Sequence, residues 1–290
     1  MVFLPTGCSV FRTTAVDQNV HISRELTLQG LQSCHQQNCT EAEGLFSRAV
    51  KSDPNNIEAR MNLADKYRER GAIRAAILQL EQSLEIAPEN VLATVKLGEC
   101  YSETNQIAAA HQLALTALRL DRELIAGWLL KARTLRQMGR REDALADYQQ
   151  AIRINPDDDQ APMAMATLYQ ELGRPLRALT TLDRIAGGYT EADVPDSILI
   201  QQAVALRQMK RTSDAISRLE SGFQREGYSE AVAEFYIAAL LETNQHEKAL
   251  SAIQLAAYQY PGSAGINRLA ASLPSVDRPS LALNQRGFLK

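Results

Sequence analysis

Alanine returns along this chain at an almost constant interval, and that interval restricts the folds that the sequence can adopt. Seven alanines stand in register, at steps of 34, 34, 34, 34, 37 and 34 residues: Ala42, Ala76, Ala110, Ala144, Ala178, Ala215 and Ala249. Repetition at a period of roughly 20 to 50 residues is the sequence signature of a repeat array, in which each unit packs on the next. The interval therefore predicts an elongated array of short units.

Each unit has the pattern of two helices joined by a turn. Residues four and seven places after each aligned alanine form one helical face of mostly apolar or small side chains. Twelve places before it, six of seven residues are glycine or alanine, so a second helix backbone can approach closely. Gly71, Gly139 and Gly173 stand between the two helices, where a left-handed residue ends a helix. Pro54 and Pro88 then mark the turn into the next unit.

This pattern resembles the tetratricopeptide repeat (TPR) family, including Trp128 at the family's tryptophan position. The resemblance implies an all-α fold, a right-handed superhelical solenoid of about seven helix-turn-helix repeats with a C-terminal capping helix. The implied repeats are 23–56, 57–90, 91–124, 125–158, 159–195, 196–229 and 230–263, with the cap at 264–273. The three extra residues of the 37-residue step (37 − 34 = 3) predict a longer loop in GGYTEADVPDS.

The two ends lie outside the repeats, and the first of them raises the question of a lipid anchor. Residues 1–22 are expected to be a flexible segment, and residues 274–290 a loose tail. Thr6 and Gly7 before Cys8 match the end of a lipobox, the motif that precedes a lipidated cysteine, although Pro5 departs from the usual leucine. If Cys8 is lipidated, the genomic sequence upstream should continue in frame with a basic and apolar segment. Two locations stay open: a membrane-anchored lipoprotein of the cell envelope, or a cytoplasmic protein with a flexible tail.

Composition and motifs argue against several other classes of function. A net charge of −3 gives no general attraction to nucleic acid, and no apolar run approaches the roughly 20 residues of a membrane span. No catalytic motif is present, so we expect neither catalytic residues nor a cofactor. The run Asp157–Asp159 is interpreted as a helix cap rather than a metal site. Cys34, His35 and Cys39 supply at most three ligands where structural zinc needs four, and we predict no metal site.

Cys34 and Cys39 flank the turn between the first two helices, and their spacing permits a disulfide. Such a bond would persist only in an oxidising compartment. A disulfide and two reduced thiols are both compatible with the sequence.

Function is therefore expected in recognition. TPR proteins bind peptide segments on the concave surface lined by the first helix of each repeat, and the resemblance implies that the corresponding positions contact a partner here. Those positions are Asn62, Asp65 and Arg68; Lys96 and Glu99; Leu129, Arg133 and Arg136; Met163, Thr167 and Gln170; and Gln201, Val204 and Arg207. Arg133 and Arg136 share one helical face, and arginine pairs well with carboxylates. They predict an acidic peptide partner, while the alternative interpretation is an exposed face of solvated charges.

The clamp by which some TPR proteins hold the C-terminal tails of cytosolic chaperones is only partly present. Its places hold Thr27, Leu31, Asn62, Leu92 and Lys96, so binding of such tails is not expected. Three hypotheses follow: a non-enzymatic scaffold for partner proteins, an exported lipoprotein assisting cell-envelope assembly, secretion or pilus biogenesis, and an enzyme accessory or small-molecule binder.

Overall fold

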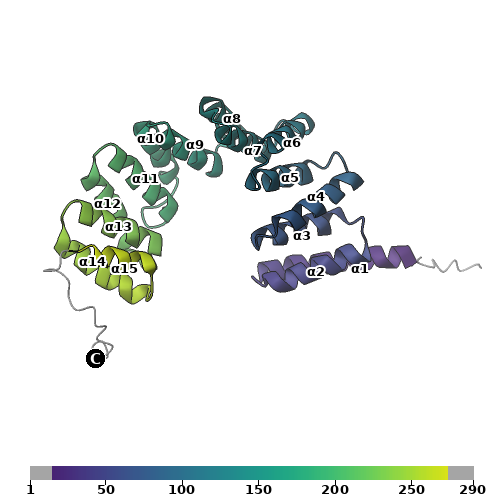
Figure 1. The fold of residues 1–290 in the computed structure, drawn as a ribbon, viewed down its shortest axis with the longest axis horizontal. Coiled ribbons are helices and arrows are strands. Elements are labelled where there is room, and N and C mark those ends of the chain that lie inside the picture. Colours follow the sequence, from purple (N-terminus) through teal and green to yellow (C-terminus); the bar gives the residue numbers. More distant parts are fainter. Residues whose placement is uncertain (1–14, 274–290) are drawn as a thin grey trace, which may run out of the picture. The chain divides into compact units, whose positions relative to one another are not determined.

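The computed structural model describes residues 15–273, and all regular structure within them is α-helical (Figure 1). Fifteen helices are present in this part of the chain, and no strand. The chain divides into two compact units, Met1–Ile154 and Asn155–Lys290, which are described in turn. The predicted all-α solenoid of helix pairs is confirmed.

Unit 1 contains four helix pairs, each joined by a short turn. The helices are α1 (Ala15–His35), α2 (Cys39–Ser52), α3 (Ile57–Glu69), α4 (Ile73–Ile86), α5 (Val91–Glu103), α6 (Ile107–Leu120), α7 (Ile125–Gln137) and α8 (Arg141–Ile154). We refer to the odd-numbered helices before α15 as first helices and to the even-numbered ones as second helices.

Unit 2 contains three further pairs and one closing helix. The helices are α9 (Gln160–Glu171), α10 (Pro175–Ala186), α11 (Asp196–Gln208), α12 (Thr212–Phe223), α13 (Glu230–Glu242), α14 (His246–Gln259) and α15 (Ala264–Ala271). The connection between α10 and α11 covers residues 187–195, where the sequence predicts a longer loop. Arg225 donates to the carbonyls of Val194 and Glu191, at 2.6 Å each, and so fastens this loop to the end of α12.

The aligned small residues lie where helices pack most closely. All seven aligned alanines have no exposed surface. A Cβ atom added to Gly30 would stand 2.5 Å from the buried ring of Phe46, and one added to Gly98 would stand 2.5 Å from Leu130. Both distances are well inside van der Waals contact. Glycine at these two positions is therefore required by the approach of neighbouring helices.

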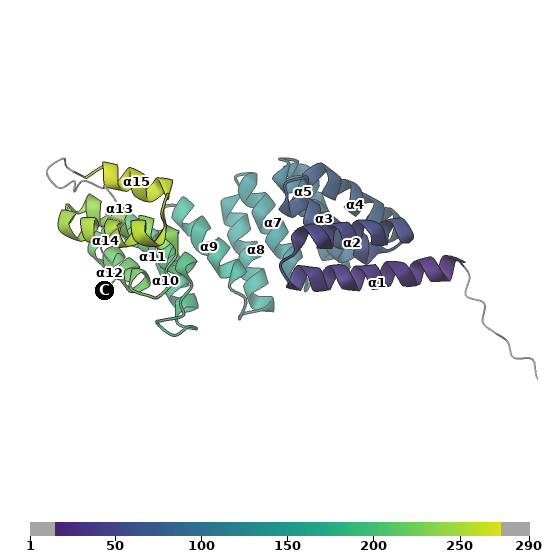
Figure 2. The ribbon, with the colours of Figure 1, turned by 90° about the horizontal axis from the view of Figure 1, so that it is seen from below.

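The N-terminal boundary of the first repeat needs correction. Residues 1–22 were expected to be a flexible segment, but α1 begins at Ala15 and includes residues 15–22. Figure 2 shows α1 continuing past the end of α2. Residues 15–22 contain neither glycine nor proline, and Asp17 in the first turn favours the positive end of a helix. Cys8 and residues 274–290 lie outside the described residues.

Cys34 and Cys39 are both free thiols in this structure, which corresponds to the second of the two alternatives. Cys34 packs on the core around Phe46 and Leu63, whereas Cys39 is exposed at the start of α2. The two side chains thus occupy different environments on either side of the turn.

Candidate protein-binding surface

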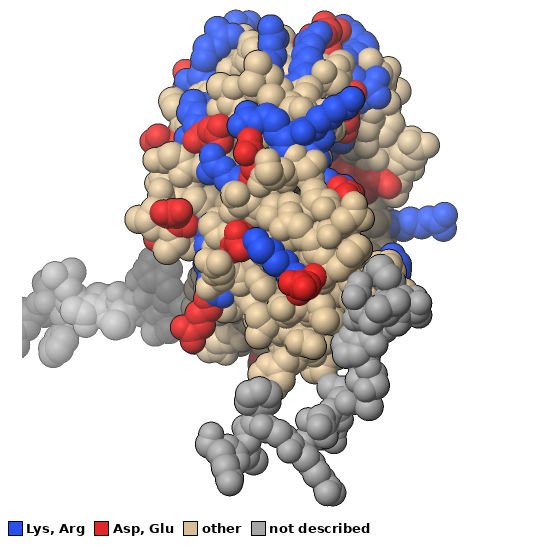
Figure 3. Space-filling view, turned by 90° about the vertical axis from the view of Figure 1, so that its left-hand side faces the viewer, with Lys and Arg blue, Asp and Glu red and all other residues tan. Residues whose placement is uncertain are grey.

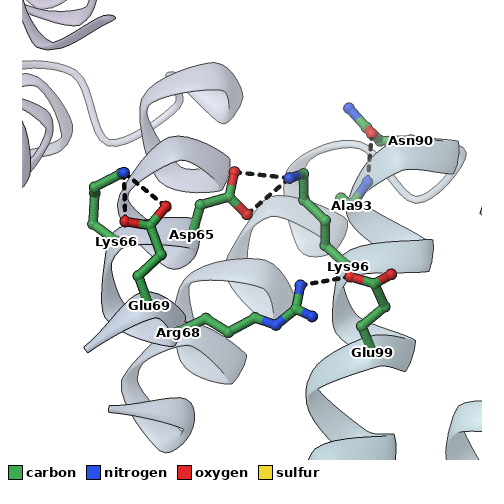
Figure 4. A network of polar contacts seen from close by, with 8 residues as sticks. All are labelled: Asp65, Lys66, Arg68, Glu69, Asn90, Ala93, Lys96 and Glu99. Atoms are coloured by element: carbon green, nitrogen blue, oxygen red, sulfur yellow. Dashed lines mark hydrogen bonds and ion pairs between the residues drawn. The ribbon is translucent and has the colours of Figure 1, made fainter. Parts of the chain in front are cut away.

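In unit 1 the predicted partner-contact residues lie on α3, α5 and α7, and charged members of this set pair between neighbouring helices. Lys96 Nζ on α5 donates to both carboxylate oxygens of Asp65 on α3, at 2.8 and 2.7 Å. Arg68 on α3 donates to Glu99 on α5 at 2.6 Å (Figure 4). These bonds connect the first helices of neighbouring repeats.

Two further contacts extend the network. Arg68 also donates from Nε to Glu103, at 2.6 Å. The other carboxylate oxygen of Glu99 lies 3.6 Å from Arg133 on α7. Burial disfavours the charge on Arg68, but Glu99 and Glu103 outweigh that effect and raise its pKa. We call Asp65, Arg68, Lys96, Glu99, Glu103 and Arg133 the ion-pair network of unit 1.

The cations on this surface are matched by carboxylates. Arg68, Lys96 and Arg133 supply three positive charges, and Asp65, Glu99 and Glu103 supply three negative ones. Within the network the formal charges cancel. Arg133 has the most exposed side chain of the three cations, at 44%, and the longest contact.

Two of the uncharged residues predicted to contact a partner differ in how exposed they are. Leu129 is a core residue with 9% of its surface exposed, so it offers a partner little area. Asn62 is half-buried on α3. The clamp position Thr27 is also buried, and its hydroxyl donates to the carbonyl of Ser23.

In unit 2 the predicted residues lie on α9 and α11, and their contacts are mainly between neutral groups. Gln170 donates to the backbone carbonyl of Gln201 at 2.9 Å, and the Thr167 hydroxyl lies 3.4 Å from the Gln201 side chain. Arg207 pairs with Glu242 on α13. Met163 and Val204 are half-buried between these positions. We call Thr167, Gln170 and Gln201 the amide network of unit 2.

Sequence reasoning missed Glu103 and Glu242, which complete the pairs of Arg68 and Arg207. A periodic signal could have found them, since each stands 35 residues after its arginine. Other contacts between first helices span 31 residues, as from Asp65 to Lys96 and from Gln170 to Gln201, or 34 residues, as from Glu99 to Arg133. A spacing of one repeat length, give or take a few residues, therefore identifies the side chains that pair between neighbouring repeats.

Charge is unevenly distributed over the face of the molecule in Figure 3, where Lys and Arg side chains gather in the upper part and the lower part is mostly uncharged. Arg218 on α12 lies 3.5 Å from Asp183 on α10, and Arg211 pairs with Asp214.

Within residues 15–273, no three His, Cys, Asp or Glu side chains form a group that could hold a metal ion, and no helix is long and apolar enough to cross a bilayer.

Comparison with protein families gives matches to the tetratricopeptide repeat, at residues 35–91, 67–134 and 135–194. Together these ranges cover just over half of the chain. Rat serine/threonine-protein phosphatase 5 is 27% identical over 160 residues, which are 55% of this chain and 30% of that protein. The chain thus matches less than a third of the length of this curated relative.

Solved structures of low sequence identity share the fold. Yeast Tom70 superposes with a TM-score of 0.65 at 15% identity, over 88% of this chain and 54% of that one. PilW, described as a type IV pilus biogenesis factor, superposes with a TM-score of 0.64 at 19% identity, over 73% of this chain and 96% of that one.

Proposed function

This chain belongs to the tetratricopeptide repeat family, and we propose that it is a non-enzymatic scaffold that binds an extended segment of a partner protein across its first helices. The ion-pair network of unit 1 is the observation that supports this proposal most. It places six charged side chains on three consecutive first helices, five of them at positions where the family resemblance implies contact with a peptide.

The network is suited to recognition because its groups are both held in place and accessible. Its closest pairs fix Arg68 and Lys96 between two helices, so little side-chain freedom is lost on binding. The side chains of Lys96 and Asp65 nevertheless remain 31% and 30% exposed. A partner therefore meets polar groups that are already oriented.

We expect the partner segment to carry a carboxylate that pairs with Arg133. Its 3.6 Å contact with Glu99 is the weakest of the network, so a new carboxylate can replace it without breaking the shorter bonds. A guanidinium can hold a carboxylate by two parallel hydrogen bonds, which gives orientation as well as affinity. Arg136 follows three residues later on the same helix and extends the same face.

Charge reversal at both arginines tests this proposal. Arg133→Glu with Arg136→Glu should weaken capture of the partner at least about tenfold, because an acidic segment is then repelled. Helicity by circular dichroism should be unchanged. The matched control is Arg119→Glu with Arg153→Glu, which makes the same change of charge on the second helices α6 and α8. Captured proteins are compared by quantitative mass spectrometry, and an identical set from both variants would exclude this surface.

A second candidate function is that of an exported lipoprotein assisting cell-envelope assembly, secretion or pilus biogenesis. The sequence Thr6-Gly7-Cys8 supports it, and the likeness to PilW is compatible with it. Metabolic labelling with an alkyne fatty acid, in cells expressing the native gene, should label the protein and not its Cys8→Ala variant. Absence of label from the unaltered protein, in cells whose other lipoproteins are labelled, would dispose of this candidate.

A further inference from the structure

A cleft in unit 2 shares no residue with either the ion-pair network or the amide network. It is lined by side chains of α10, α11 and α12 and by the connection of residues 187–195. Its volume is about 470 Å³, which lies within the roughly 300–1,000 Å³ of sites that hold small molecules. The cleft is therefore a separate feature of the fold and is large enough for a small ligand.

The connection between α10 and α11 forms one side of this cleft. It is the longest connection between consecutive helices in the described part of the chain, and the insertion of the 37-residue step lies in it. Glu191 and Val194 of this connection line the cleft. Arg225, which also lines it, donates to the backbone carbonyls of both residues at 2.6 Å. The insertion is thus fastened against the cleft at two points.

Positive and negative side chains line the cleft in equal number. The cations are Arg211, Arg218 and Arg225, and the anions are Asp183, Glu191 and Asp214. An anionic ligand would be repelled by the carboxylates, and a cationic ligand by the guanidinium groups. A ligand that carries both signs of charge and has no net charge is attracted by both sets.

One pair of opposite charges in the cleft is open. Arg218 lies 3.5 Å from Asp183, farther than the roughly 2.7–2.9 Å of a charge-assisted hydrogen bond. Arg211 and Asp214, by contrast, are joined at 2.6 Å. The side chains of Arg218 and Asp183 are 49% and 45% exposed. A ligand can therefore reach both of these charges without breaking a short ion pair.

The surroundings of the open pair supply an anchor and an apolar surface. Gln202 on α11 has no exposed surface, and its side-chain amide donates to Oδ1 of Asp183 at 2.7 Å. This bond keeps the carboxylate oriented when its arginine partner turns toward a ligand. Leu179, Leu199 and Leu206 line the same cleft, so apolar side chains lie close to the charges.

We infer that this cleft binds a free α-amino acid with an apolar side chain. A single carbon separates the carboxylate of an amino acid from its ammonium group, so the two charges can meet Arg218 and Asp183 together. The guanidinium holds the carboxylate by two parallel hydrogen bonds, and the apolar side chain lies against the leucines. The site does not depend on the proposed binding of a segment across the first helices, since the two surfaces share no residue.

The Nε–H signal of Arg218 reports binding directly. It is assigned by its absence from an Arg218→Met variant, and the full chain is titrated by NMR at about pH 6, where carboxylates are ionised and amines are protonated. The probes are leucine, 4-methylpentanoate, which lacks the ammonium group, and 3-methylbutylamine, which lacks the carboxylate. Leucine should shift the signal with a dissociation constant of about 1 mM. The other two should bind at least about fivefold more weakly.

A matched pair of variants tests the cation. Arg218→Met removes the guanidinium and should weaken binding of leucine at least about tenfold. Lys248→Met removes an exposed cation from the neighbouring cleft, between α12 and α14, and should change binding by less than about twofold. The backbone amide signals of Ser217 and Ser221, which also line the cleft, follow the titration in both variants. Circular dichroism should show unchanged helicity.

Asp183→Asn tests the anion through a change of preference that a loss of folding would not produce. The asparagine carbonyl still accepts from Gln202, but the negative charge is gone. The cleft then carries one excess positive charge, so 4-methylpentanoate should bind at least as tightly as leucine, the reverse of the order in the unaltered protein.

The inference is overturned if about 20 mM leucine leaves the Arg218 signal in place. It is also overturned if 4-methylpentanoate or 3-methylbutylamine binds the unaltered protein as tightly as leucine, or if Arg218→Met and Lys248→Met have the same effect. Equally tight binding of glycine would exclude the apolar side chain from recognition. Equally tight binding of N-acetyl-leucine N-methylamide, which carries no charge, would assign the cleft to a polypeptide segment and overturn the assignment to a free amino acid.

Discussion

The ion-pair network of unit 1 and the amide network of unit 2 join first helices in the same way but with different chemistry. Both use contacts that span 31 residues, from Asp65 to Lys96 in one unit and from Gln170 to Gln201 in the other. The first is charged and the second is neutral. The repeat thus fixes which positions meet, and the side chains decide the chemistry of the contact between them.

The hydrophobic cores of the two units do not show this difference between charged and neutral contacts. Disrupting either core should give the largest loss of stability. Leu130→Ala in unit 1 and Leu219→Ala in unit 2 each remove a fully buried side chain. Each should lower the free energy of unfolding by about 2–5 kcal/mol. Urea denaturation followed by circular dichroism measures the change. A loss below about 1 kcal/mol in one unit alone would show that the two cores are not equivalent.

Removing the shared carboxylate of unit 1 should have an intermediate effect. Glu99→Gln weakens the contacts with both Arg68 and Arg133, and should lower the free energy of unfolding by about 1 kcal/mol. The matched change in unit 2, Gln201→Leu, loses only a 3.4 Å contact with Thr167 and should change the free energy of unfolding by less than about 0.5 kcal/mol.

Salt provides the control for this pair of variants. At about 1 M NaCl, screening should reduce the effect of Glu99→Gln and leave that of Gln201→Leu unchanged. If both variants respond to salt alike, the distinction between a charged and a neutral network is not energetically important.

The fold could be predicted from the sequence because small residues recur where helices touch. Ala42 and its six equivalents, together with Gly30 and Gly98, are required by close packing, and packing is repeated in every unit. The start of α1 was missed because residues 15–22 lie outside the repeat and carry no alignment signal. Helix formation there depends on local residues such as Asp17.

The surface was less predictable because charge depends on neighbours. Arg68 and Arg133 could be placed on first helices by register, but their pairing with Glu99 requires two repeats to be in contact.

The smallest effect on stability is expected from a tyrosine–glutamate contact that occurs once in each unit, and only at alkaline pH. Tyr101 on α5 donates to Glu81 at 2.8 Å, and Tyr236 on α13 donates to Glu220 at 3.1 Å. Burial and the adjacent glutamate raise the pKa of each tyrosine to about 12. An unfolded tyrosine has a pKa of about 10, so the unfolded chain loses this proton first.

The stabilisation from each tyrosine is therefore complete below about pH 10 and is lost as the pH rises toward 12. Tyr101→Phe and Tyr236→Phe should each reduce the fall in unfolding free energy between pH 9 and pH 11, as measured by urea denaturation at the two values. If the two reductions are equal, this contact from a first helix to the preceding second helix has the same effect on stability in both units. The difference between the units then lies in the ion-pair network and the amide network. A fall as steep in both variants as in the unaltered protein would show that neither tyrosine keeps its proton through its glutamate.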